Sequence, residues 1–170
     1  MKLLALTLAF ASPLAFAQAK TDYTLTGGSV HFHVPGDWTA IMEKSDGDPQ
    51  AVIFQVPDPV TQGTEDTASV TVKTRAMKSG DDFQSFVTEA FERAKGQSGY
   101  ENDATNKDSS VHRYYVTRSK VRYLVRDAYQ MNGNVGIEVR CQRPLLDSTP
   151  KEWNDQFDAA CANVVASMKK

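Results

Sequence analysis

The chain has few of the residues that mark redox, metal-binding or glycosylated proteins. It contains only two cysteines and three histidines among 170 residues, and it has no Asn-x-Ser/Thr sequon. No Cys-x-x-Cys pair occurs, which argues against a catalytic thiol site. No apolar run after the N-terminal segment is long enough to span a bilayer, so stable membrane insertion is not expected. The net charge of −2 argues against a nucleic-acid-binding protein, since such domains carry an excess of Lys and Arg.

The N-terminal segment has the layout of a cleaved secretory signal. Lys2 precedes an apolar run over 3–10, and Ala15-Phe16-Ala17 follows with the small-x-small pattern that a signal peptidase recognises. We expect residues 1–17 to be removed and residues 18–170 to form a single domain. No cysteine lies at the cleavage point, which argues against a lipoprotein anchor. The expected location is the periplasm of a Gram-negative bacterium.

Alternation of apolar and polar residues predicts two groups of strands. Val30, Phe32 and Val34 alternate with polar neighbours, which is typical of a strand with one buried face. Asn132-Gly133 predicts a type I′ hairpin turn, because both central residues of that turn need positive φ. The polar segment 97–110 is expected to be a long exposed loop. The predicted strands are 23–26, 29–34, 38–44, 50–56, 68–76, 111–117, 121–130 and 135–142.

Apolar residues recur at helical spacing in two further segments. From Phe83 to Ala94 they predict an amphipathic helix with Asp81 as its N-cap. A second helix is expected to begin after Thr149 as N-cap, with Pro150 at its first position. Strands, a helix, a three-stranded meander and a closing helix predict an α+β fold. In this fold a mostly antiparallel sheet is covered by amphipathic helices.

The chain resembles a known family in several features. These are the turn at Val34-Pro35-Gly36-Asp37-Trp38 with the paired strands after it, the helix over 83–94, the meander through 122–140, and the C-terminal helix ending at 164–168. In these features it is similar to the α/β/α sandwich domains related to PsbP, the extrinsic photosystem II protein, and to the Ran-binding Mog protein, a family with bacterial periplasmic members. The resemblance implies the sandwich fold. It also implies a role without catalysis, since the relatives act as assembly factors, chaperones and binding modules.

The two cysteines, Cys141 and Cys161, are both expected to face the core. Cys141 shares strand parity with Val139, and Cys161 lies in the apolar stripe of the last helix. In an oxidising compartment they are expected to form a disulfide that ties this helix to the sheet. The alternative is a pair of buried free thiols.

No group of residues has the spacing of a metal or catalytic site. His31 and His33 point to the same side of a predicted strand, but no further ligand follows in metal-site spacing, so two solvent-facing histidines are favoured. Asp46-Gly47-Asp48 lacks the remaining ligands of a calcium loop and is expected to be a turn. Gly96-Gln97-Ser98-Gly99 follows a predicted helix, unlike the nucleophile elbow of hydrolases. We therefore predict no enzyme activity, no cofactor and no metal.

Arginine is concentrated in the meander, where six of the eight arginines lie between residues 111 and 143. Arg122 and Arg126 share one strand face, and Arg140 lies on the polar face of the next strand, so their guanidinium groups are expected to line one surface. Together with Arg118 they are the predicted partner-binding residues, suited to carboxylates on an acidic partner. The alternative is a solvated face whose arginines pair with acids on neighbouring strands.

Three functions are compatible with these features. The leading prediction is a non-enzymatic exported protein that binds a protein partner, in its sharpest form an immunity-type inhibitor of a bacterial toxin that acts in the periplasm. The second is a PsbP-like small-ligand-binding or assembly-factor module, which a pocket between sheet and helix would favour. The third is an enzyme with an unrecognised site, which would require polar groups of perturbed pKa in a cleft.

Overall fold

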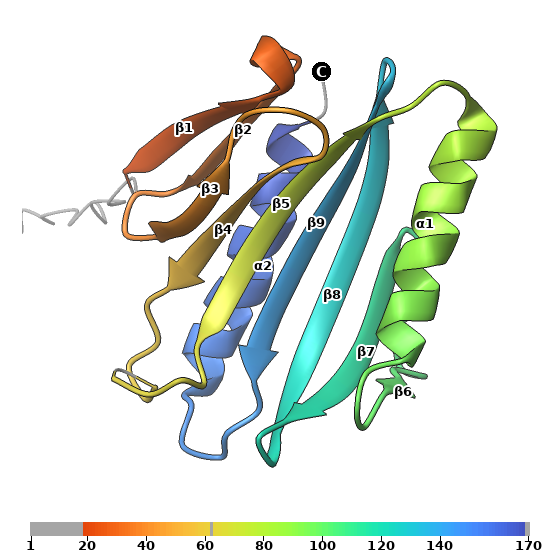
Figure 1. Ribbon diagram of the computed structural model, residues 1–170. Coiled ribbons are helices and arrows are strands. Elements are labelled where there is room, and N and C mark those ends of the chain that lie inside the picture. Colours follow the sequence, from red (N-terminus) through yellow and green to blue (C-terminus); the bar gives the residue numbers. More distant parts are fainter. Residues whose placement is uncertain (1–18, 62, 169–170) are drawn as a thin grey trace, which may run out of the picture.

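The computed structural model describes residues 19–61 and 63–168, which form two antiparallel β-sheets and two α-helices (Figure 1). The predicted signal segment, residues 1–17, lies outside the described residues, so export and cleavage after Ala17 stay predictions. The strands are β1 (Lys20–Leu25), β2 (Val30–Pro35), β3 (Thr39–Lys44), β4 (Gln50–Val56), β5 (Ala68–Ala76), β6 (Glu101–Asn102), β7 (Val111–Arg118), β8 (Val121–Asn132) and β9 (Val135–Pro144), and the helices are α1 (Gly80–Lys95) and α2 (Lys151–Ser167).

The larger sheet has seven strands in the order β3-β4-β5-β9-β8-β7-β6, and β1 and β2 pair as a separate hairpin. Every pair of neighbouring strands is antiparallel. Helix α1 lies over β7 and β8 on one face of the large sheet, and α2 lies behind the other face (Figure 1). The predicted α+β class, an antiparallel sheet covered by amphipathic helices, is confirmed.

Each face of the sheet carries its own apolar core, because successive side chains of a strand point to opposite faces. The larger core lies between α2, the β1–β2 hairpin and the sheet, and it includes Phe32, Phe54 and Phe157. The smaller core, on the α1 side, includes Tyr114 and Val125. The two helices therefore stabilise different faces of one sheet.

The turn between β8 and β9 differs from the predicted type. Asn132 pairs with Val135, so the two central residues are Gly133 and Asn134 and not Asn132 and Gly133. Of these two central residues only Gly133 has a positive φ, 57°. This is the pattern of a type II′ turn, with glycine at the first central position. The hairpin was predicted correctly and its turn type was wrong.

Both predicted helix N-caps are wrong. The N-cap of α1 is Ser79, two residues before the predicted Asp81, and its hydroxyl accepts a hydrogen bond from the backbone N–H of Asp82. The Asp82 carboxylate accepts a hydrogen bond from the backbone N–H of Lys78. The two hydrogen bonds run in opposite directions between the cap and the first turn, as in a capping box. Helix α2 has Pro150 at its N-cap with no side-chain cap, and the Thr149 hydroxyl is buried without a hydrogen-bond partner among the described residues.

The segment 97–110, predicted as an exposed loop, is partly ordered against the sheet edge. Its β6 strand pairs with β7, and Asp103 beside it is 3% exposed. The carboxylate of Asp103 accepts hydrogen bonds from Thr105 and lies 2.7 Å from an Nη of Arg113. The buried carboxylate of Asp103 thus attaches this polar segment to the edge of the sheet.

Candidate functional site

A disulfide joins the two cysteines across the larger core. Cys141 on β9 and Cys161 on α2 are bonded, with their Cα atoms 6.3 Å apart and both side chains buried. This is the pairing that strand parity and the helical stripe predict. The bond attaches the middle of α2 to a central strand of the sheet.

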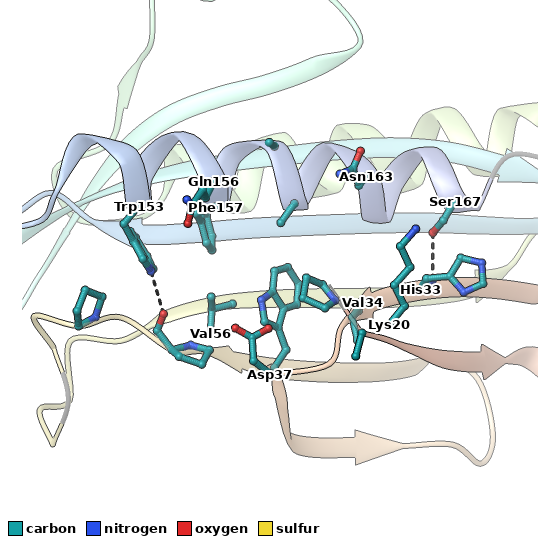
Figure 2. A pocket seen from close by; sticks show the side chains of 17 residues that line it. Lys20, His33, Val34, Asp37, Val56, Trp153, Gln156, Phe157, Asn163 and Ser167 are labelled. Atoms are coloured by element: carbon teal, nitrogen blue, oxygen red, sulfur yellow. Dashed lines mark hydrogen bonds between the residues drawn. The ribbon is translucent and has the colours of Figure 1, made fainter. Parts of the chain in front are cut away.

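A groove with a cavity volume of about 560 Å³ follows one side of α2. Its helical wall extends from Trp153 to Ser167, about 21 Å at the rise of an α-helix. The opposite wall comes from the β1–β2 hairpin, the turn after β2 and the segment after β4. Figure 2 shows Trp153 and Ser167 at opposite ends of the helical wall, with Phe157 pointing from α2 toward the strands.

The groove has an apolar interior that depends on a tight turn before β3. Trp38, Val56 and Phe157 line it and are each less than 9% exposed. The turn closes through the N–H of Trp38, which donates to the carbonyl of Pro35. At Gly36 a Cβ atom would lie 3.1 Å from the carbonyl oxygen of Ala19, so the absence of a side chain lets the two segments approach.

Hydrogen bonds attach α2 to the opposite wall at each end of the groove. The indole N–H of Trp153 donates to the carbonyl of Pro57 at 2.9 Å, and the backbone N–H of His33 donates to the Ser167 hydroxyl at 3.1 Å (Figure 2). With the disulfide between them, these contacts determine the position of the helical wall at three points.

Four polar side chains line the groove without using their hydrogen-bonding capacity internally. These are the ammonium of Lys20, the carboxylate of Asp37, and the carboxamides of Gln156 and Asn163. Among the described residues, none of these four side chains has a hydrogen bond or ion pair to the protein. The groove thus combines an apolar interior with charged and amide groups that are available to a ligand.

The four predicted partner-binding arginines do not share one surface, which corrects that prediction. Arg140 pairs across the strands with Asp127, whereas Arg126 pairs with Cys141, so Arg126 and Arg140 point to opposite faces. Arg118 lies opposite Val121 and is on the α1 face, while Arg122 is on the α2 face with Arg126. Parity along one strand is readable from the sequence, but the register between strands is not.

Each of these arginines is also engaged within the protein. Arg118 donates to the side chain of Gln97, and Arg126 donates to the carbonyl of Asp158. Arg122 bonds to Glu101 at 2.6 Å and lies over the ring of Tyr115. The alternative that the sequence left open, arginines paired with acids of neighbouring strands, therefore holds for part of the set: Arg122 and Arg140 pair with acids, whereas Arg118 and Arg126 bond to neutral groups.

Arg140 belongs to a buried polar network under α1. It donates two hydrogen bonds to the carboxylate of Asp127, at 2.8 and 2.9 Å, and Asp127 is fully buried. The hydroxyls of Tyr114 and Tyr129 donate to the same carboxylate. Burial raises the pKa of Tyr114 and of Tyr129. The Asp127 carboxylate is saturated by these donors, so the network supports the sheet rather than offering a free catalytic base.

Two further titratable groups adjoin this network. Burial raises the pKa of Glu138, against the opposing effect of Arg140 nearby. Burial lowers the pKa of His112, whose ring stacks on Phe91 at 3.9 Å between centroids and whose Nε2 lies 3.2 Å from the Tyr100 hydroxyl. No serine, threonine or cysteine among the described residues is hydrogen-bonded to His112, so the arrangement lacks the nucleophile and base pair of a hydrolase.

His31 and His33 are both exposed on β2, and the ring of His33 contacts the carboxylate of Asp22. Across residues 19–61 and 63–168, no three His, Cys, Asp or Glu side chains are grouped in a way that could hold a metal ion. In the same part of the chain, neither helix is long and apolar enough to cross a membrane.

The groove is the feature that the sequence did not reveal. Its walls come from residues 19–38, 56–59 and 153–167, which are distant in sequence and meet only in the fold. The one local signal is the Pro35-Gly36-Asp37-Trp38 turn, which the sequence identifies as a turn without indicating that Trp38 lines a cavity.

No protein-family model and no curated protein matches the chain. Similar solved structures include LpqN of Mycobacterium tuberculosis, a protein involved in cell envelope biogenesis, at 10% identity over 89% of this chain and 83% of that chain, with a TM-score of 0.48. The Ran-binding protein Mog1p of Saccharomyces cerevisiae is 12% identical over 89% of this chain and 93% of that chain, with a TM-score of 0.49. The second is a Ran-binding Mog protein, which the sequence resemblance named; likeness to PsbP and a periplasmic membership stay predictions. The fold class rests on the sheet and helices of this chain itself.

Proposed function

We propose that this protein is a non-enzymatic exported binding module whose functional site is the groove along α2. The observation that carries the proposal is the groove itself, with its apolar interior, its attached ends and its four unengaged polar side chains. Cavities of this size with a few converging polar groups are the usual form of ligand sites. The sequence prediction that such a pocket favours is the second one, a ligand-binding or assembly-factor module.

The toxin-neutralising role was predicted from a small exported domain with one disulfide and a charged binding face, and of these features the structure contains the disulfide but not the charged face. The arginines predicted to form the charged face are divided between two faces of the sheet and engaged within the protein. We therefore place partner or ligand binding in the groove and not on the meander.

Site-specific photo-cross-linking in the source cells tests this assignment. A photoreactive residue in place of Ala159, which lines the groove, should form a discrete adduct. The adduct should disappear when Ala160→Trp fills the cavity in the same chain. A photoreactive residue in place of Gln55 serves as the matched control, because that exposed side chain lies on the other face of β4 from Val56.

The melting temperature of the Ala160→Trp variant should stay within a few degrees of the parent, which separates a filled groove from a misfolded chain. The same adduct from Gln55, or an adduct from Ala159 that survives Ala160→Trp in a folded variant, would refute the groove as the binding site.

A further inference from the structure

We propose that the groove binds an extended peptide segment of a partner protein and holds it by its main chain. This inference rests on the proposed function, since it names the class of ligand for the same groove. It is carried by the kind, number and spacing of the polar side chains along α2.

The two carboxamides on the helical wall match the repeat of an extended peptide. Gln156 and Asn163 are seven residues apart, about two turns, and therefore lie on the same side of α2 roughly 10 Å apart. Three residues of an extended chain span the same length, at roughly 3.3 Å per residue. A carboxamide presents both a donor and an acceptor, which is what a peptide unit requires.

Trp38 offers a further group to a peptide main chain. Its side chain lines the groove and is 8% exposed, yet its indole N–H donates to no group among the described residues. An indole N–H is a donor only, and the carbonyl of a peptide seated in the groove would accept a hydrogen bond from it. The apolar walls around Trp38, formed by Val56 and Phe157, suit one apolar or proline side chain of the same segment.

The distribution of polar groups distinguishes a peptide from a lipid. A single-chain lipid needs polar groups at one end of the groove and an apolar channel over the rest. Here Gln156 lies near the Trp153 end, Asn163 nearer the Ser167 end, and Asp37 on the facing wall (Figure 2). Polar side chains thus occur along the whole length of the groove. This distribution suits a peptide, whose main-chain N–H and C=O groups repeat along its length.

The two unpaired charges predict the charge pattern of the segment. Lys20, at the end near Ser167, suits a carboxylate, and Asp37 suits a basic side chain farther along the groove (Figure 2). The carboxylate is either an acidic side chain or the C-terminus of the partner, because both offer the same group to Lys20.

Selection from a random octapeptide display library, followed by binding of the synthetic consensus peptide measured by fluorescence anisotropy, tests the inference. Gln156→Ala and Asn163→Ala should each weaken binding three- to tenfold, the usual effect of one lost hydrogen bond. Gln55→Ala, on the opposite face, should leave the Kd unchanged. N-methylation of the central peptide amide should weaken binding, and the carboxamide variants should add little further loss for the methylated peptide.

Lys20→Gln should weaken the binding of the peptide that carries the carboxylate. It should leave unchanged the Kd of a peptide without that carboxylate. Amidation of the peptide C-terminus distinguishes the two sources: a loss of binding identifies the terminal carboxylate, and retained binding identifies an acidic side chain. Either result supports the proposal.

Peptides that bind equally well to the Ala160→Trp variant, carboxamide variants with unchanged Kd, or displacement of the peptide by lysophosphatidylcholine below its micellar concentration would overturn the peptide assignment. If no groove-dependent peptide is selected while the Ala159 adduct persists, the peptide inference fails and the proposed function stands. If both fail, the groove is not the binding site.

Discussion

Ser119 and Lys120 form the two-residue turn between β7 and β8 with φ angles of 47° and 71°. Positive φ at both central positions is the pattern of a type I′ turn, which strongly favours Asn-Gly. A residue with a Cβ atom is strained there, and glycine is not. Lys120→Gly should therefore raise the free energy of unfolding by about 1 kcal/mol, as measured by urea denaturation.

Gly133→Ala is the matched comparison, because Gly133 has a φ of 57° in the other hairpin of the meander. This variant should lower the free energy of unfolding by a similar amount. An unchanged urea midpoint for Lys120→Gly would show that the turn is not strained in solution.

His112 gives the stability of the protein a pH dependence with a defined sign. Burial lowers its pKa below the usual value of 6.5, while Asp127 opposes the shift and Arg140 and Lys95 support it. The unfolded chain therefore takes up a proton at higher pH than the folded chain. The stability contributed by neutral His112 is complete above pH 6.5 and is lost as the pH falls through the lowered pKa.

His112→Gln should remove part of the fall in the urea midpoint between pH 7.5 and pH 5.5. The comparison uses the slope of stability against pH, which separates the titration from any loss of packing against Phe91. Glu138 has the opposite effect on the pH dependence of stability. Its pKa is raised in the folded protein, so the folded state binds this proton more readily and gains stability as the pH falls. A variant whose pH slope equals that of the parent would assign the effect to other groups.

At the scale of elements, Ser79 and Asp81 can be compared as N-caps of α1. Ser79→Ala should lower the free energy of unfolding by about 1 kcal/mol, because the N–H of Asp82 loses its acceptor. Asp81→Ala, at the predicted but incorrect cap, should lower it by less than about 0.5 kcal/mol through the helix dipole alone. Thermal denaturation of the two variants measures both effects, and equal losses would contradict the assignment of Ser79.

Elements with strong local patterns were predictable from the sequence, and their exact ends were less so. The strands 50–56 and 68–76 match β4 and β5, because their alternation is long and flanked by turn residues. The caps were wrong because Ser79 and Asp81 both satisfy the residue preference and only the backbone φ and ψ decide between them. The single arginine surface was wrong because it required the register between β8 and β9, which depends on the turn type.

At the scale of the whole molecule, the sheet is stabilised unequally on its two faces. The core under α2 holds most of the buried apolar side chains and the disulfide, whereas the core under α1 is small. Local opening follows the amount of buried apolar contact. Amide hydrogen exchange should therefore be faster in α1 than in α2 and β9, as mass spectrometry of peptic fragments would measure.

A chain with Cys141→Ala and Cys161→Ala provides the control for this comparison. Exchange in α2 should accelerate in this variant, while exchange in α1 stays nearly as in the parent. Closing a loop of 20 residues stabilises a fold by about 3 kcal/mol on chain-entropy grounds. Equal exchange rates of the two helices in the parent would contradict the unequal cores.

The groove shows why the proposed binding site was the part least accessible from the sequence. Trp38 and Trp153 each have a local reason for their position, one after a turn and one in a helical stripe, and nothing in either segment indicates the other. Their meeting depends on the sheet order and on the face that α2 covers. Sequence patterns predict which side chains are buried more readily than which distant segments leave a cavity between them.

The disulfide between Cys141 and Cys161 has a consequence for recognition. Because α2 is attached covalently at its middle and by hydrogen bonds at Trp153 and Ser167, the wall of the groove is in place before any ligand arrives. The loss of conformational entropy that accompanies ordering of a binding surface then occurs during folding and oxidation, not during association. Ligand affinity should for this reason depend on the oxidation state of two sulfur atoms that the ligand never touches.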